Sequence, residues 1–167
     1  MFHDMRRKAQ ALSPEESIQI LTEGSSGVLA LAAQPQEEYP YAVPLSYVYG
    51  DGKIWFHCAS SGHKLELLRQ NPRASFCVIG KDQIMPEEYT TYYRSVIAFG
   101  NIRILEDEQE MLRAIERLMV KYAPEDDGAN RSSIIQQSLG RLCMLEMTVE
   151  HLTGKEAIEL TRARSER

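Results

Sequence analysis

The residues best suited to chemistry lie in one stretch, IWFHCASSGHK at residues 54–64. An apolar, β-like run ends there, a loop of small residues follows, and a helix is predicted to begin at His63. The backbone N–H groups of that helix start, the hydroxyls of Ser60 and Ser61 and the ammonium of Lys64 could together hold a phosphate. Ser-Ser-Gly before a helix is also ordinary capping, so the stretch fits both a phosphate site and a plain helix start.

Two histidines, His57 and His63, flank this loop. An imidazole titrates near neutral pH, so either side chain could transfer a proton. Both residues are equally compatible with a position in solvent or in the core. Two ligands without a third make a poor metal site, and we predict no metal centre.

A second candidate is the apolar run YAVPLSYVY, which precedes the first stretch. Strand alternation places Val43, Leu45 and Tyr47 on one face. Pro44 and Ser46 fall on the other, so one face could pack on a barrel core and the other against a flat ring or a partner subunit. Pro44 predicts an edge or a bulge, where Ser46 and nearby amides could face a heterocycle. An edge strand without a ligand fits these residues equally well.

Other chemical motifs are missing from the sequence. It has no Gly-rich phosphate loop before Lys-Ser or Lys-Thr, no His-Glu-x-x-His, no Gly-x-Ser-x-Gly and no Gly-x-Gly-x-x-Gly. Cys58, Cys77 and Cys143 form no Cys-x-x-Cys pair and sit in apolar, β-like runs. We predict that they are buried free thiols.

Composition limits the classes of protein and partner. The 167 residues, 43% of them hydrophobic, fit one domain over residues 1–167, with a core at about 13–156 and a polar tail at 157–167. A formal net charge of -5 gives no general attraction to nucleic acid or to an anionic membrane. Residues 1–10 offer neither a secretory apolar region nor a spanning helix, so we expect a soluble, cytoplasmic protein.

The apolar pattern predicts strands separated by inserted helices. A capped helix begins at Ser13-Pro14, and Gly100 predicts a bulge. Residues 49–53 form a tight hairpin, and residues 81–92 and 124–130 are predicted loops. Further helices are expected at 63–70, 107–122 and 132–139, and strands at 27–33, 41–49, 54–59, 74–79, 95–105 and 141–149. Strands that arrive mostly in sequence favour an antiparallel barrel with helical decorations, of the α+β or mostly-β class.

Several short motifs, in their order and spacing, resemble the nitroimidazole-resistance branch of the pyridoxamine-phosphate-oxidase-like flavoproteins. No single motif is specific, but the collinear set is, and it spans residues 24–156. The motifs are YAVPLSYVY at 41–49, IWFHCA at 54–59, GHKL at 62–65, NPR at 71–73, YYRSVIAFG at 92–100 and HLTGKE at 151–156.

The resemblance implies a six-stranded antiparallel split β-barrel and a homodimer with two FMN sites at the subunit interface. Each site would be lined by residues of both chains. His57 would lie beside the flavin as the residue that positions the substrate or protonates an intermediate. The other implied flavin contacts are Val43, Pro44, Leu45, Ser46, Tyr47, Cys58, Ala59, Ser60, Ser61, His63 and Lys64, with Arg94, Ser95 and Lys155 as further contacts.

The expected activity is FMN-dependent reduction of small nitro- or quinone-like compounds, with electrons passing through the flavin ring. The C-terminal tail has no arginine-rich motif for pyridoxal phosphate, so oxidation of vitamin B6 is not expected. Two alternatives stay open, because a barrel alone does not fix the chemistry. One is a flavin- or haem-binding split-barrel protein without rapid turnover, and the other is a deazaflavin-dependent reductase.

Overall fold

The computed structural model describes residues 2–33, 39–126, 128–138 and 140–165. The helices are η1 (Lys8–Gln10), α1 (Pro14–Glu23), α2 (His63–Gln70), η2 (Pro86–Glu88), α3 (Glu108–Tyr122), α4 (Gly128–Ser138) and α5 (Ile158–Ser165). The strands are β1 (Ser26–Leu31), β2 (Tyr41–Ser46), β3 (Val48–Gly50), β4 (Lys53–Ala59), β5 (Arg73–Met85), β6 (Thr90–Ile104) and β7 (Leu142–Glu156). Within the described ranges, no helix is both long and apolar enough to cross a membrane.

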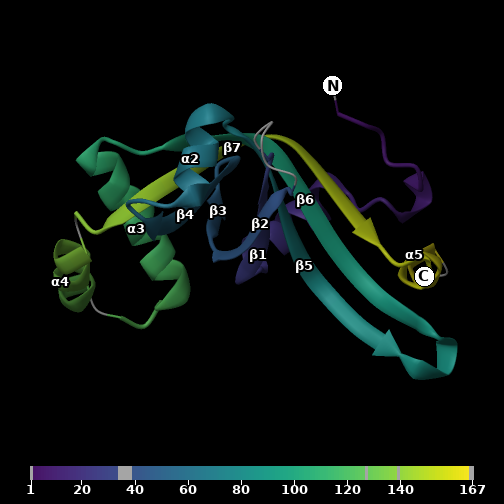
Figure 1. Ribbon diagram of the computed structural model, residues 1–167. Coiled ribbons are helices and arrows are strands. Elements are labelled where there is room, and N and C mark those ends of the chain that lie inside the picture. The colour runs from purple at the N-terminus through teal and green to yellow at the C-terminus, as the bar shows by residue number, and fades with distance from the viewer. Residues whose placement is uncertain (1, 34–38, 127, 139, 166–167) are drawn as a thin grey trace.

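The seven strands form one antiparallel sheet in the order β2-β1-β5-β6-β7-β4-β3. β2 and β3 follow each other in sequence but lie at the two ends of this order, so the sheet curls back on itself without closing. β2 also lies beside β4 across the opening. β5, β6 and the end of β7 extend away from the barrel, opposite to α3 and α4 (Figure 1). The predicted class, an α+β antiparallel split barrel, is confirmed, with seven strands instead of six.

The strand predicted over residues 41–49 is divided at Tyr47. β2 pairs with β1, whereas β3 pairs with β4. Tyr47 is fully buried, and its hydroxyl donates to the Leu21 carbonyl at 2.6 Å. Its backbone N–H donates to the hydroxyl of Tyr122 at 2.9 Å. These bonds hold the chain where it crosses from one edge of the sheet to the other, which accounts for the additional strand.

The polar segment over residues 81–92 is a β-hairpin, and the prediction of an irregular loop was wrong. β5 continues to Met85 and β6 begins at Thr90, with η2 and a left-handed Tyr89 (φ 51°) between them. A bulge at Gly80 shifts the register of the two strands. Beyond it, most side chains are exposed, so the segment lacks the apolar alternation that marks a buried strand.

The C-terminal region is more regular than predicted. The final strand, predicted over residues 141–149, extends to Glu156, and part of the predicted polar tail forms α5. Glu156 is fully buried, with carboxylate oxygens 2.9 Å from Arg94 and 3.1 Å from Arg164 of α5. A buried carboxylate requires such partners. Because polar residues of this kind interrupt the apolar pattern, the sequence does not indicate that the strand continues to Glu156. α4 likewise begins before its predicted start.

The other predicted features lie where the sequence places them. α1 begins with a capping box in which Ser13 and Glu16 exchange hydrogen bonds, and α2 has the predicted bounds. Asp107 caps α3. The β3–β4 turn places Asp51 and Gly52 at positive φ, as a tight hairpin requires.

Two hydrophobic cores share strand β4. Ile54 and Phe56 face the barrel interior, together with side chains of β1, β5, β6 and α2. Trp55 faces the opposite side, where it packs with Ile115 and Leu118 of α3. β4 is therefore covered on both faces, and the helices α3 and α4 lie over its outer face.

Gly100 marks a close approach between β6 and β7. The register of the two strands shifts between Phe99 and Gly100, which confirms the predicted bulge. A Cβ atom added at Gly100 would lie 1.9 Å from the carbonyl oxygen of Thr148. Since that neighbour is backbone, only a shift of the strands could relieve the overlap.

We predict that Gly100→Ala lowers the free energy of unfolding by about 3 kcal/mol, because the methyl group forces β6 and β7 apart. Urea titration followed by circular dichroism measures the change. Gly128→Ala is the control, since a Cβ there meets none of the described atoms within 4 Å. Equal stability of the two variants would contradict the close approach.

Candidate functional site

The loop from Ala59 to the start of α2 presents hydrogen-bond donors to solvent. Ala59, Ser60 and Ser61 are exposed, and Lys64 is half-buried in the first turn of α2. Gly62 is the N-cap at φ 127°, a conformation that favours glycine. Among the described residues, no side chain caps this helix. The first N–H groups of α2 are thus positioned to bind an anion, and the two serines and Lys64 lie beside them.

The same loop is positioned against β2. The His63 ring meets the Tyr41 ring edge-on, with ring centres 5.1 Å apart. Nδ1 of His63 also lies 3.7 Å from the Glu66 carboxylate. These contacts hold the start of α2 beside the start of β2. No cluster of three His, Cys, Asp or Glu side chains that could hold a metal ion occurs in the described part of the chain.

His57 and Ser46 line a common pocket of about 350 Å³, which we call the His57 pocket. His57 comes from the outer face of β4, and Ser46 from the end of β2. Helices α3 and α4 form the opposite wall. The lining residues are Ser46, His57, Ile115, Leu118, Met119, Tyr122, Ile134, Ser138 and Leu142. The structure therefore brings together two predicted site residues that are far apart in sequence.

Four other predicted contacts have side chains that face the barrel interior. Val43 and Leu45 pack against the inner core, as the alternation predicted, and Cys58 does the same from β4. Tyr47 is fully buried, and burial raises the pKa of its hydroxyl strongly. These residues can offer only backbone groups to a ligand outside the barrel, whereas Pro44 is exposed on the outer side of β2.

Ser95 and Lys155 lie on the outer face of the sheet and pair across β6 and β7. They line a pocket of about 480 Å³ together with Ile97, Phe99 and His151. Neither residue lines the His57 pocket. Arg94 is not beside them, because its guanidinium pairs with the buried Glu156. A single chain thus places the predicted contacts in separate groups.

A row of paired residues across the outer face shows how far β2, which carries Pro44, lies from β7, which carries Lys155. Pro44 pairs with Val28, Val28 with Cys77, Cys77 with Ile97, and Ile97 with Thr153. The row crosses five strands, so its ends are about 19 Å apart along the curved sheet at the usual strand spacing. Val28 and Ile97 are exposed, which makes the middle of this face apolar.

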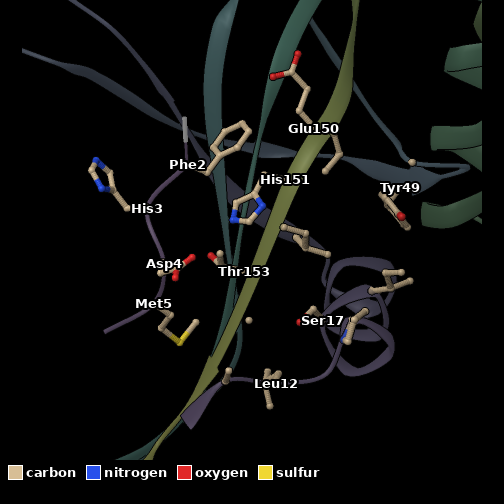
Figure 2. A pocket seen from close by; sticks show the side chains of 17 residues that line it. Phe2, His3, Asp4, Met5, Leu12, Ser17, Tyr49, Glu150, His151 and Thr153 are labelled. Atoms are coloured by element: carbon tan, nitrogen blue, oxygen red, sulfur yellow. The ribbon is translucent and has the colours of Figure 1, made fainter. Parts of the chain in front are cut away.

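The N-terminal segment packs on the outer sheet face at β6 and β7, where Phe2 contacts Phe99 and His151. Sequence reasoning missed this feature. Phe2 stacks on His151 with ring centres 4.6 Å apart. Figure 2 shows both side chains among those that line the adjacent pocket. The segment encloses a pocket of about 470 Å³ against β7 and α1. None of the predicted flavin contacts lines that pocket. Phe2 lies in the short segment MFHDMRRKAQ, whose few apolar residues have neither a helical nor a strand period, so no periodic pattern could indicate its packing.

Comparison with known families identifies the chain. The family model described as pyridoxamine 5'-phosphate oxidase matches residues 13–156, which is most of the sequence. The chain belongs to this family. The match spans the split barrel from α1 to the end of β7 and includes both the α2 loop and the His57 pocket. Among curated proteins, none matches the chain.

Solved structures of family-like proteins share the fold. A candidate 5-nitroimidazole antibiotic resistance protein from Bacteroides thetaiotaomicron has 17% identity and a TM-score of 0.73, over 87% of this chain and 86% of that one. A FAD-binding protein from Mesorhizobium loti has 25% identity and a TM-score of 0.63, over 89% and 97% of the two chains. A FAD- and haem-binding protein from Mycobacterium smegmatis has 17% identity and a TM-score of 0.70, over 93% and 80%.

Cys58 and Cys143 face each other beside the α2 loop. They are directly paired residues of β4 and β7. Burial and, to a smaller extent, the nearby Cys143 raise the pKa of Cys58 to about 11, while the charge of Lys64 opposes both effects. Burial also raises the pKa of Cys143. Both thiols are therefore protonated at neutral pH. All three cysteines are free, as predicted, but only Cys143 is buried, whereas Cys58 and Cys77 are half-buried.

We predict that alkylation of Cys58 by iodoacetamide accelerates about tenfold per pH unit from pH 7 to pH 10, because only the thiolate reacts. Peptide mass spectrometry measures the rate. Cys143→Ala should shift the profile to lower pH by removing a neighbour that raises the pKa. A midpoint near 8.5 in the unaltered protein would contradict the burial of this thiol.

Proposed function

We propose that this protein is an FMN-dependent oxidoreductase that works as a homodimer and reduces small nitro- or quinone-like compounds. The observation that carries the proposal is the uncapped start of α2 beside Ser60, Ser61 and Lys64, within a chain of the pyridoxamine 5'-phosphate oxidase family. Solved relatives in the same fold include FAD-binding proteins. A flavin that ends in a phosphate matches the chemistry of this loop.

The residues of the loop fit a phosphate group. The first N–H groups of a helix point toward the ligand and carry the positive end of the helix dipole. Lys64 adds a charge in the first turn, and the exposed hydroxyls of Ser60 and Ser61 can each donate a hydrogen bond. Together these groups would bind a phosphate more tightly than any one of them.

The remaining site residues have distinct tasks. When bound, the flavin supplies the electron transfer, and the protein supplies orientation and a dry pocket. His57 is exposed at the mouth of an otherwise mostly apolar pocket, where its imidazole can hold a substrate oxygen or donate a proton. Ser46 provides a second hydroxyl in the same pocket.

A homodimer accounts for the separation of the predicted contacts. Ser95 and Lys155 do not meet the α2 loop within one chain, yet the family resemblance predicts flavin contacts at both places. A second copy packed on the outer sheet face would bring the Ser95 group of one protomer toward the α2 loop of its partner. The exposed apolar residues Val28, Ile79 and Ile97 on that face support such an interface.

Charge reversal at Lys64 tests the cofactor site. Purified protein incubated with FMN and desalted should retain flavin absorption, and Lys64→Glu should raise the Kd for FMN at least about tenfold by reversing a charge at the phosphate. Lys8→Glu is the control, because Lys8 is a highly exposed lysine that pairs with the exposed Asp4.

The outcomes distinguish the proposal from its alternatives. Equal FMN affinity of Lys64→Glu and the control would remove the phosphate assignment. Retained flavin that no reductant or electron acceptor alters would favour a binding protein without turnover. Preference for a deazaflavin in a competition titration would favour the deazaflavin-dependent alternative.

A second prediction tests the interface. Ile97→Asp should convert the dimer to a monomer, because a carboxylate placed in the centre of an apolar contact loses its water without gaining a partner. Sedimentation velocity measures the mass, and Val120→Asp is the control at another exposed aliphatic residue, on α3. A dimer that persists in Ile97→Asp but not in the control would place the interface on the helices instead.

A further inference from the structure

We infer that the His57 pocket is the substrate chamber and that it accepts neutral, planar aromatic acceptors while rejecting phosphorylated and other strongly anionic compounds. The inference rests on the proposed function and adds the location and charge selectivity of its substrate site. It also separates this chain from the reaction that its family is named after, since that substrate carries a phosphate.

The size of the pocket suits a small ring compound. Its volume of about 350 Å³ falls at the lower end of the usual range for small-molecule sites. The wall opposite His57 is formed by Ile115, Leu118 and Met119 of α3 and by Ile134 of α4. The three α3 side chains belong to the outer hydrophobic core, so the pocket is the open end of a packed apolar layer.

The pocket carries no fixed charge. Among its lining residues, which all lie in the described part of the chain, none is Lys, Arg, Asp or Glu. An anion that entered would lose water without meeting a cation, which is costly in an apolar site. The cationic groups suited to a phosphate lie at the α2 loop, and Lys64 does not line this pocket.

The polar groups of the pocket are unequally available. The Tyr122 hydroxyl already accepts from the Tyr47 N–H and bonds to the Tyr47 carbonyl, and Ser138 donates to the Ile134 carbonyl at 2.8 Å. By contrast, neither the His57 imidazole nor the Ser46 hydroxyl has a hydrogen-bond partner among the described residues. Two available donors in an apolar chamber suit a ligand with a carbonyl or nitro oxygen.

Ile134 marks the mouth of the chamber. It lines the pocket and is 43% exposed, so a side chain placed there is open both to solvent and to the pocket. Val120 offers a matched position on α3, because it is 46% exposed and lies outside the pocket. An arginine at either residue therefore adds the same charge, at the mouth of the His57 pocket for Ile134 and outside the pocket for Val120.

The test compares two nearly isosteric probes, neutral 4-nitrobenzenesulfonamide and anionic 4-nitrobenzenesulfonate, by isothermal titration of the flavin-loaded protein. We expect the neutral probe to bind at least about tenfold more tightly, because only the anion loses its solvation without a partner. Its binding should quench the emission of Trp55, the single tryptophan, which packs beside Ile115 and Leu118. His57→Ala should weaken the neutral probe about fivefold through loss of one hydrogen bond.

Two arginine variants test whether the preference for the neutral probe arises in the His57 pocket. Ile134→Arg should improve binding of the sulfonate about tenfold by supplying the missing cation, whereas Val120→Arg should leave both affinities unchanged. Equal affinity of the two probes, or equal effects of the two arginine variants, would overturn the assignment. Flavin absorbance of the same samples separates the claims. Lost flavin with retained selectivity would contradict only the proposed cofactor, and retained flavin without selectivity would contradict only the chamber.

Discussion

The candidate site depends on strand β4 being covered on both of its faces. Ile54 and Phe56 fill the barrel, while Trp55 packs under α3. His57 follows on the same outer face as Trp55, but at the point where the helical cover ends, and it is exposed. A strand with two buried faces needs an almost continuous apolar sequence. The one polar side chain in this run therefore stands at the edge of an apolar layer, where it can meet a ligand without disturbing either core.

The register that creates this arrangement is fixed by a buried carboxylate. Glu146 of β7 accepts hydrogen bonds from Lys53 of β4 at 2.9 Å, from Arg103 of β6 at 2.9 Å and from the indole of Trp55 at 3.0 Å. Burial tends to raise the pKa of Glu146, but these donors outweigh it and the pKa is lowered. A slip of β4 by one residue against β7 would break the contacts of Lys53 and Trp55 with Glu146 and turn His57 into the barrel. The charged cluster thus specifies register at the site.

The sequence indicates the local elements well where one principle decides the structure. Capping chemistry locates α1 and α2, apolar periodicity locates α3, and the β4 segment reads as a strand because both of its faces are apolar. It fails where the environment is set by distant residues. The β5–β6 hairpin is predicted as a loop because its exposed faces need no alternation. The end of β7 is missed as a strand because Glu156 finds its partners in the distant Arg94 and Arg164.

The site itself was only partly predictable for the same reason. The α2 loop is continuous in sequence, so its donors can be inferred from a helix start. The His57 pocket needs Ile115 and Ile134, which follow His57 by more than fifty residues and lie in helices with only ordinary amphipathic or weak patterns. Spacing along the chain carries no information about such a wall. The resemblance to a flavoprotein family pointed to His57 without its surroundings, and the tertiary structure supplies them.

In the proposed dimer, cofactor binding and dimer assembly are thermodynamically linked. Residues such as Ser95 reach a flavin only from the partner, so the flavin binds the dimer more tightly than the monomer. Linkage then requires that flavin stabilise the dimer by the same factor. The apolar row across β1, β5 and β6 supplies a contact that does not depend on the cofactor. Assembly can therefore precede cofactor binding, and the flavin would strengthen an interface that the exposed sheet face already favours.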